Sequence, residues 1–207
     1  SRPRTERRRR FGATAIANRH NGVNINGGIN TTVGGTTAGA RNVISGNLGD
    51  GVGIWGAGAT GNIVQGNYVG LSANGVTGLG NAAEGINIAN VPGNTIGGTA
   101  AGAGNHVSGN GFRGIAVHGG NGNGNFVQGN FVGANAAGNI AVPNGIAGIQ
   151  IQSNSNTIGG TTPGARNYVA GNASFGIAII FGTDNLVQGN YVGIGSAGSM
   201  LSNGTGI

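Results

Sequence analysis

The sequence predicts an all-β protein, a parallel β-helix in which short strands stack coil upon coil. Three observations predict this class: a segment that recurs at a fixed interval, apolar residues that alternate with a period of two, and the lack of a useful apolar run with a period of 3.6 residues. The composition agrees, because 49 of the 207 residues are glycine. Glycine and asparagine both tolerate the positive φ angles that tight corners require.

The repeat is 63 residues long and is present three times. Two segments define it: the first recurs at 22–25, 85–88 and 148–151, and the second at 62–70, 125–133 and 185–193. Each unit contains two related halves, because 85–88 is followed by the similar 114–117. Each half holds three short apolar segments separated by turns. We therefore expect three strands per coil and about six coils, arranged as three double-coil repeats.

The alternation predicts which side chains face the interior of the coils. The interior ladder of the first strands should be Val23 and Ile25, Val52 and Ile54, Ile86 and Ile88, Ile115 and Val117, Ile149 and Ile151, and Ile177 and Ile179. A second ladder should be Val33, Val64, Ile96, Val127, Ile158 and Val187. Each coil buries these residues against its neighbours, so a single coil would not be stable alone.

Asparagine recurs at the corners between these segments. The repeated positions are Asn62, Asn125 and Asn185 at one corner and Asn67, Asn130 and Asn190 at another. Stacked asparagines can hydrogen-bond from coil to coil and satisfy backbone groups in the turns. We therefore predict side-chain amide ladders along the molecule.

The charge of the chain is concentrated at its start. All ten basic residues are arginine, and six of them lie in residues 1–10, whereas the rest is nearly neutral. We expect residues 1–10 to be an Arg-rich tail or linker and residues 11–207 to be the β-helix. A basic run can bind an acidic polymer. A linker or a processing remnant is the simpler interpretation, and nucleic acid is not the partner that we expect.

The coil pattern resembles a known group of proteins. Residues 85–88 (GINI) and 62–67 (NIVQGN) are similar to the coils of right-handed parallel β-helix repeat proteins of the pectate-lyase-like superfamily, and the resemblance covers residues 12–207. It implies a single-stranded, right-handed β-helix located outside the cell or on its surface. The superfamily includes polysaccharide lyases, hydrolases, epimerases, phage tailspikes and non-catalytic surface repeats. The resemblance therefore leaves the function open.

One column of residues could carry catalytic chemistry. It precedes the first strand of each coil and runs Asn21, Asp50, Glu84, Arg113, Ala147, Phe175. Asp50, Glu84 and Arg113 should lie on consecutive coils, about 4.8 Å apart. Two carboxylates about 5 Å apart suit a retaining glycosidase, and the arginine could neutralise an acidic sugar or act as a base in β-elimination. The simpler interpretation is a solvated acid–arginine ladder of little energetic weight.

A second set of side chains should lie on the outer face of the first strands. Trp55, Asn87, His118 and Gln150 are its candidate substrate-binding residues, because aromatic rings and amides can stack on and hydrogen-bond a glycan. The alternative is a single exposed aromatic residue among ordinary solvent-facing amides. No metal or cofactor is expected, because Ca²⁺ needs about six oxygen ligands and the body holds three acids.

These observations favour a non-catalytic extracellular β-helix that acts as a structural, self-assembling or glycan-contacting surface element. Two alternatives stay open: a polysaccharide lyase or glycosidase that uses Asp50, Glu84 and Arg113, and an acidic-polymer binder that uses the Arg tail. The closing pair 206–207 matches the opening of a coil, as in a fragment of a longer array or in subunits that stack end to end. The expected partners are further copies of the chain and a polysaccharide. No apolar run approaches the ~18 residues that cross a bilayer.

Overall fold

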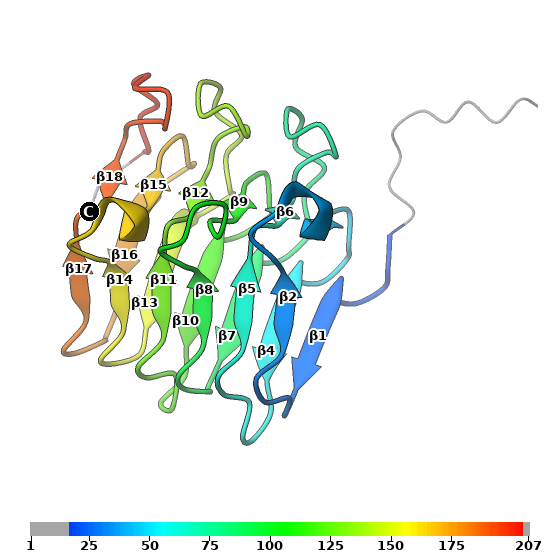
Figure 1. Cartoon of the computed structure of the whole chain (residues 1–207), viewed down its shortest axis with the longest axis vertical. Helices are drawn as coiled ribbons and strands as arrows, with labels where there is room; N and C mark the ends of the chain where they lie inside the picture. Colours follow the sequence, from blue (N-terminus) through cyan, green and yellow to red (C-terminus); the bar gives the residue numbers. More distant parts are fainter. Residues whose placement is uncertain (1–16, 205–207) are drawn as a thin grey trace, which may run out of the picture.

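The structure is a computed structural model that describes residues 17–204, and it is a parallel β-solenoid of about six coils. Each coil gives one strand to each of three sheets, so that segments far apart in the sequence lie side by side (Figure 1). The predicted all-β class is confirmed. Helix is limited, within residues 17–204, to the single turns η1 (Ala38–Ala40) and η2 (Pro163–Ala165). The Arg-rich tail 1–10 and the closing pair 206–207 lie outside this range.

The three sheets each contain six strands, and we name them A, B and C. Sheet A consists of β1 (Val23–Asn26), β4 (Val52–Trp55), β7 (Ile86–Ala89), β10 (Ile115–His118), β13 (Ala147–Gln152) and β16 (Phe175–Ile179). Sheet B consists of β2 (Thr32–Gly34), β5 (Ile63–Gln65), β8 (Thr95–Gly97), β11 (Phe126–Gln128), β14 (Thr157–Gly159) and β17 (Leu186–Gln188). Sheet C consists of β3 (Val43–Ile44), β6 (Tyr68–Val69), β9 (His106–Val107), β12 (Phe131–Val132), β15 (Tyr168–Val169) and β18 (Tyr191–Val192).

Neighbouring strands pair in parallel and keep one register through the molecule. Val23 pairs with Val52, and Val52 pairs with Ile86. The step from one coil to the next is therefore 29 residues (23 to 52) and then 34 residues (52 to 86). The two unequal coils of each 63-residue unit are confirmed. Neither single-turn helix, nor any other described segment, is a long apolar helix that could span a membrane.

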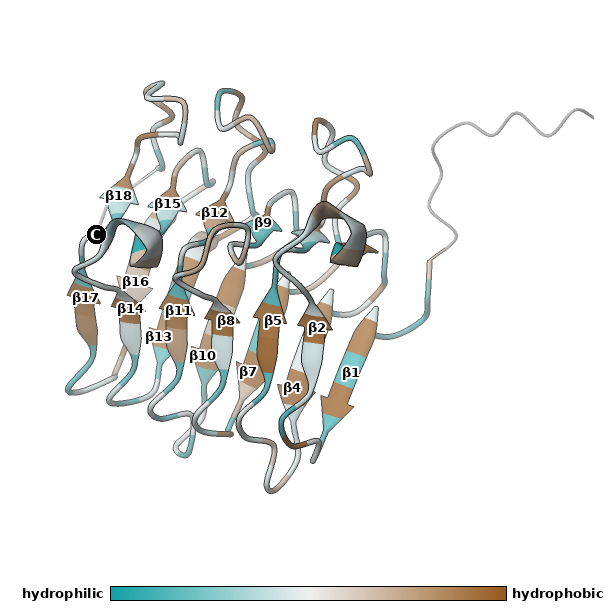
Figure 2. Ribbon diagram, in the orientation of Figure 1, coloured by the Kyte–Doolittle hydropathy of each residue, from teal (hydrophilic) through white to brown (hydrophobic). Residues whose placement is uncertain are grey.

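The apolar ladders form one core along the axis of the solenoid. The predicted interior residues Ile54, Ile88 and Ile115 are fully buried, and they belong to the same cluster as Val64 and Ile96. The strands alternate between apolar and polar residues, as Figure 2 shows for β1 and β5. A fully buried valine or isoleucine contributes roughly 1.5–3 kcal/mol relative to an exposed one. The repeated burial of these side chains therefore holds the coils together.

The predicted asparagine ladders are confirmed, and the structure extends them. The first ladder is Asn62, Asn94, Asn125, Asn156 and Asn185. The second is Asn42, Asn67, Asn105, Asn130, Asn167 and Asn190. A third, which the sequence pattern did not predict, is Asn18, Asn47, Asn81, Asn110, Asn144, Asn172 and Asn203. Every coil is thus joined to the next at its corners.

All rungs of these ladders have the same polarity. The Oδ1 atom of Asn130 accepts hydrogen bonds from the backbone N–H and the Nδ2 group of Asn105, at 3.1 and 2.9 Å. Asn130 in turn donates from its backbone N–H and its Nδ2 group to Oδ1 of Asn167, at 2.9 and 3.0 Å. Its Nδ2 group also donates to the Ile96 carbonyl. Because a buried amide without partners is costly, these ladders fix the phase of the coils.

Candidate functional site

The outer face of sheet A carries the residues that the sequence nominated for catalysis. Asp50, Glu84 and Arg113 lie just before strands β4, β7 and β10. The N–H of Gly51 donates to the Glu84 carbonyl and the N–H of Gly85 to the Arg113 carbonyl, both at 2.9 Å. The three side chains therefore stand on consecutive coils of one edge, in the order that the repeat register predicts.

The side chains of this edge contact one another and their neighbours on sheet A. Arg113 Nη1 forms a salt bridge with Glu84 Oε1 at 2.8 Å, and Arg113 Nε donates to Gln150 Oε1 at 2.8 Å. Asp50 Oδ1 accepts from the Glu84 backbone N–H at 3.2 Å, and Asp50 Oδ2 accepts from Asn87 Nδ2 at 3.0 Å. The candidate catalytic residues and two of the candidate binding residues thus form one polar network.

Burial changes the protonation of two members of this face. Asp50 is 6% exposed, and burial raises the pKa of its carboxyl; the Asn87 hydrogen bond opposes this shift, and the Glu84 carboxylate adds to it. Burial lowers the pKa of His118, with Glu84 acting to raise it and Arg113 acting to lower it. A carboxyl group with a raised pKa beside a second carboxylate is the pairing that an acid catalyst and its partner require.

The candidate binding residues do not form one surface. Gln150 is 3% exposed, so it is inaccessible to an external ligand. Trp55 lines a hollow of about 350 Å³ together with His20, Asn21 and Asn24, whereas His118 stands two coils further along the same face. The structure therefore places the aromatic ring and amides of a glycan-contacting surface around Trp55 alone.

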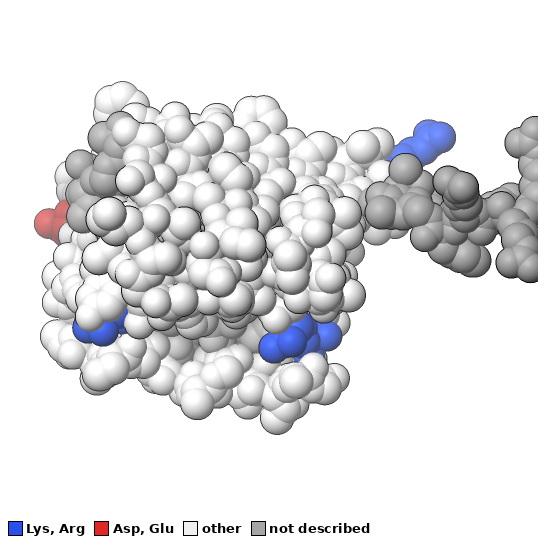
Figure 3. All heavy atoms as spheres, turned by 90° about the horizontal axis from the view of Figure 1, so that it is seen from above, with Lys and Arg blue, Asp and Glu red and all other residues white. Residues whose placement is uncertain are grey.

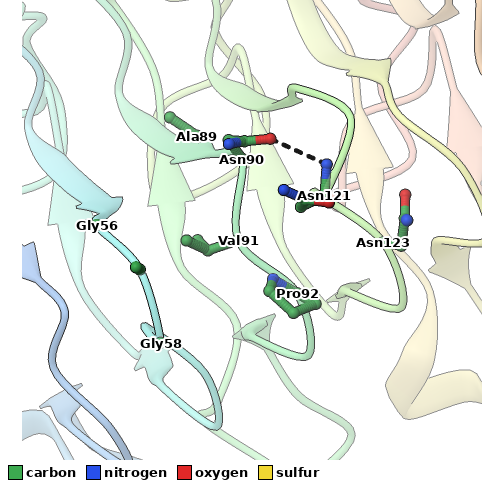
Figure 4. A pocket seen from close by; sticks show the side chains of 9 residues that line it. Gly56, Gly58, Ala89, Asn90, Val91, Pro92, Asn121 and Asn123 are labelled. Atoms are coloured by element: carbon green, nitrogen blue, oxygen red, sulfur yellow. Dashed lines mark hydrogen bonds between the residues drawn. The ribbon is translucent and has the colours of Figure 1, made fainter.

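The largest hollow lies at the turns between sheets A and B (Figure 4). It has a volume of about 620 Å³ and is lined by glycine, alanine, Val91, Pro92 and the asparagines Asn90, Asn121 and Asn123. Asn90 Oδ1 accepts a hydrogen bond from the Asn121 backbone N–H at 2.9 Å. Its lining contains no acid, base or nucleophile, so its chemistry is limited to hydrogen bonding and shape.

No group of three or more histidine, cysteine, aspartate or glutamate side chains is close enough to hold a metal ion within residues 17–204. The network on sheet A offers two carboxylates, and one of them already pairs with Arg113. Its chemistry is therefore acid–base and electrostatic. For catalysis a substrate would have to displace Arg113 from Glu84.

The sequence interpretation missed an aromatic ladder on the outer face of sheet C. It consists of Tyr68, His106, Phe131, Tyr168 and Tyr191, whose successive ring centroids are 4.6 to 5.4 Å apart. Two arginines cover its ends: Arg41 Cζ lies 4.2 Å from the ring centroid of Tyr68, and Arg166 Cζ lies 4.0 Å from that of Tyr191. The repeated tetrapeptide Gly-Ala-Arg-Asn at 39–42 and 164–167 was the available signal.

The fold and these sites define the class of protein as a parallel β-solenoid with a polar network on one sheet and an aromatic ladder on another. Comparison of the chain with protein-family models, with curated proteins and with solved structures finds no match. Membership of the pectate-lyase-like superfamily therefore has no support from these comparisons, and it stays a resemblance of the coil pattern.

Proposed function

We propose that this protein is a non-catalytic structural element, located outside the cell or on its surface, whose solenoids assemble end to end. The observation that carries the proposal is the polarity of the asparagine ladders. Among residues 17–204, Asn190 of the second ladder has no further rung to donate to, and no described donor reaches Oδ1 of Asn42 at the opposite end. A second copy placed head to tail would bring these complementary groups together.

The ends of the solenoid also concentrate its exposed apolar side chains. Ten of the fifteen large apolar residues that are exposed in the described part of the chain lie in the first and last coils, namely Ile29, Val43, Leu48, Phe175, Ile179, Phe181, Leu186, Tyr191, Ile194 and Met200. The core residues Val187 and Val192 are only partly buried, whereas Val64 and Val69 of the second coil are fully buried. A stacked copy would complete this core and pair the outer edges of β16, β17 and β18 with those of β1, β2 and β3.

Analytical ultracentrifugation over a range of concentrations tests this function. We expect the sedimentation coefficient of the wild-type chain to rise with concentration. Val187→Lys places a charge on the end-facing core of β17 and should abolish this rise. Leu186→Lys adds the same charge to the adjacent side chain, which is 48% exposed and points away from the core, so it should leave assembly intact.

Circular dichroism of both variants shows whether the coils remain folded. A wild-type chain that stays monomeric at all concentrations, or two variants that assemble equally well, would overturn the proposal.

A second candidate function is glycan contact on sheet A, and the hollow beside Trp55 favours it. Trp55 fluorescence measured against a panel of neutral and acidic polysaccharides tests it, with Trp55→Ala as the variant that should lose binding. The same panel tests the catalytic alternative, because a lyase or glycosidase acting through Asp50, Glu84 and Arg113 would release products, and Glu84→Gln would stop their release. Binding without products supports the non-catalytic function.

A further inference from the structure

The two arginines over the aromatic ladder are positioned by identical contacts. Arg41 Nε donates to the carbonyl of Gly66, and Arg166 Nε donates to the carbonyl of Gly189. Each guanidinium group lies over a tyrosine ring of the following coil, which has turned nearly perpendicular to the next ring of the ladder, by 84° for Tyr68 and 89° for Tyr191. The two guanidinium groups are thus held in fixed and equivalent orientations.

Neither arginine has an acidic partner among the described residues. The one salt bridge within residues 17–204 joins Arg113 to Glu84 on sheet A, and no acceptor among those residues receives a hydrogen bond from the Nη groups of Arg41 or Arg166. In the view from above, two groups of arginine atoms lie on one flank of the body, and uncharged residues fill the surface between them (Figure 3). Two oriented, uncompensated guanidinium groups suit bidentate binding of carboxylates.

A groove connects the two arginines. It has a volume of about 360 Å³, and it is lined by both arginines, by His106, Phe131 and Tyr168, and by the turns around 98–104 and 163–164. The third coil carries Gly104 where the first and fifth coils carry Arg41 and Arg166. A third arginine at this position would cover Phe131, and its absence leaves the middle of the groove open.

The middle of the groove offers hydrogen-bond donors. The backbone N–H groups of Thr99, Ala101 and Gly102 donate to no other described residue, and all three residues are exposed. Nδ1 of His106 is buried without a partner. Between its two charged ends the groove therefore presents neutral donors above a row of aromatic ring edges.

We propose that this groove binds an extended acidic peptide segment of a partner protein, with one carboxylate at each arginine. The two arginines stand four coils apart, which is about 20 Å at the spacing of β-strands, and six residues of extended peptide span the same distance at about 3.3 Å each. The free N–H groups would receive peptide carbonyl oxygens. A nucleic acid fits less well, because it places a negative charge every few ångströms and the groove has a cation only at each end.

Fluorescence anisotropy of labelled nine-residue peptides on the full chain, in about 0.15 M salt to screen long-range charge, tests the proposal. We expect a peptide with glutamates at positions 2 and 8 to bind more tightly than one with glutamates at positions 2 and 4, and more tightly than the matched glutamine peptide. Arg41→Gln and Arg166→Gln should each weaken the first peptide by about fivefold, a size typical of one exposed ion pair, and their combined effect should be about 25-fold.

Arg19→Gln is the matched control, because it removes the same charge from an exposed arginine outside the groove. Ala101→Glu, at an exposed position that lines the groove, should abolish binding without a change in circular dichroism. Binding that ignores glutamate spacing, or that the double variant retains, would assign the affinity to other arginines and overturn the proposal. An acidic oligosaccharide or a single-stranded oligonucleotide that binds the groove more tightly than the peptide would also overturn it, as would the absence of binding.

Discussion

His106 should make the stability of the solenoid sensitive to mild acid. Its ring lies in the aromatic ladder, 4.6 Å from Phe131 and 5.2 Å from Tyr68 between ring centroids. Burial, with a smaller contribution from Arg41, lowers the pKa of His106 from 6.5 to about 4. Since the unfolded chain binds a proton more readily than the folded chain between these values, stability is complete above pH 6.5 and falls as the pH drops towards 4.

The expected loss follows from the size of this shift. Each pKa unit corresponds to about 1.36 kcal/mol, so protonation of His106 should cost about 3 kcal/mol of folding free energy. His106→Phe removes the titrating group and continues the ladder with the ring that the next coil already uses at Phe131. The variant should match the wild type near neutral pH and exceed its stability by about 3 kcal/mol near pH 4.

Urea denaturation followed by circular dichroism at pH 7.5 and at pH 4 measures this difference. Carboxyl groups also titrate in that window, but they do so in both proteins and cancel in the comparison. His20→Gln is the control, because it removes an exposed histidine. An equal acid-induced loss in wild type and His106→Phe would refute the reasoning.

Three further predictions concern the core, the ladders and the sheet A network. Ile96→Ala should lower the free energy of unfolding by about 3 kcal/mol, and the outward-facing Ile63→Ala by less than about 1 kcal/mol, as equilibrium denaturation will show. Asn130→Ala should cost about 3 kcal/mol, because it leaves ladder groups of Asn105 and Asn167 unpaired; Gln128→Ala, outside the ladder, is its control, and an equal cost would contradict the role of the ladders. Glu84→Gln should lower the pKa of Asp50, because the Glu84 carboxylate raises it; a carbon-detected NMR titration that shows no decrease would exclude this coupling.

Much of the fold was predictable because each coil repeats the same physical constraints. The period-two apolar segments predicted the burial of residues such as Ile54 and Ile88, and the 63-residue unit predicted the register that stacks Asp50, Glu84 and Arg113. The third asparagine ladder was missed because its members, Asn81 and Asn144 among them, lie in turns of differing length. The two single-turn helices were missed because three residues carry no helical periodicity.

The sites were less predictable, because they depend on side-chain contacts between coils. Gln150 looked solvent-facing by alternation, yet it is buried and accepts a hydrogen bond from Arg113. The aromatic ladder was hidden because its third-strand positions mix His106 with tyrosine and phenylalanine. The repeated arginines at 41 and 166 could be read as part of the repeat, and only the structure shows them over a groove that Gly104 leaves open.

Electron microscopy of the purified wild-type chain tests end-to-end assembly by direct observation. The polarity of the ladders predicts rods that keep the width of one solenoid and grow in steps of about 29 Å, which is six coils at the strand spacing of about 4.8 Å. Val187→Lys should yield single particles. Wild-type particles of one subunit at every concentration, or assemblies that grow sideways instead of along the axis, would contradict the proposed function.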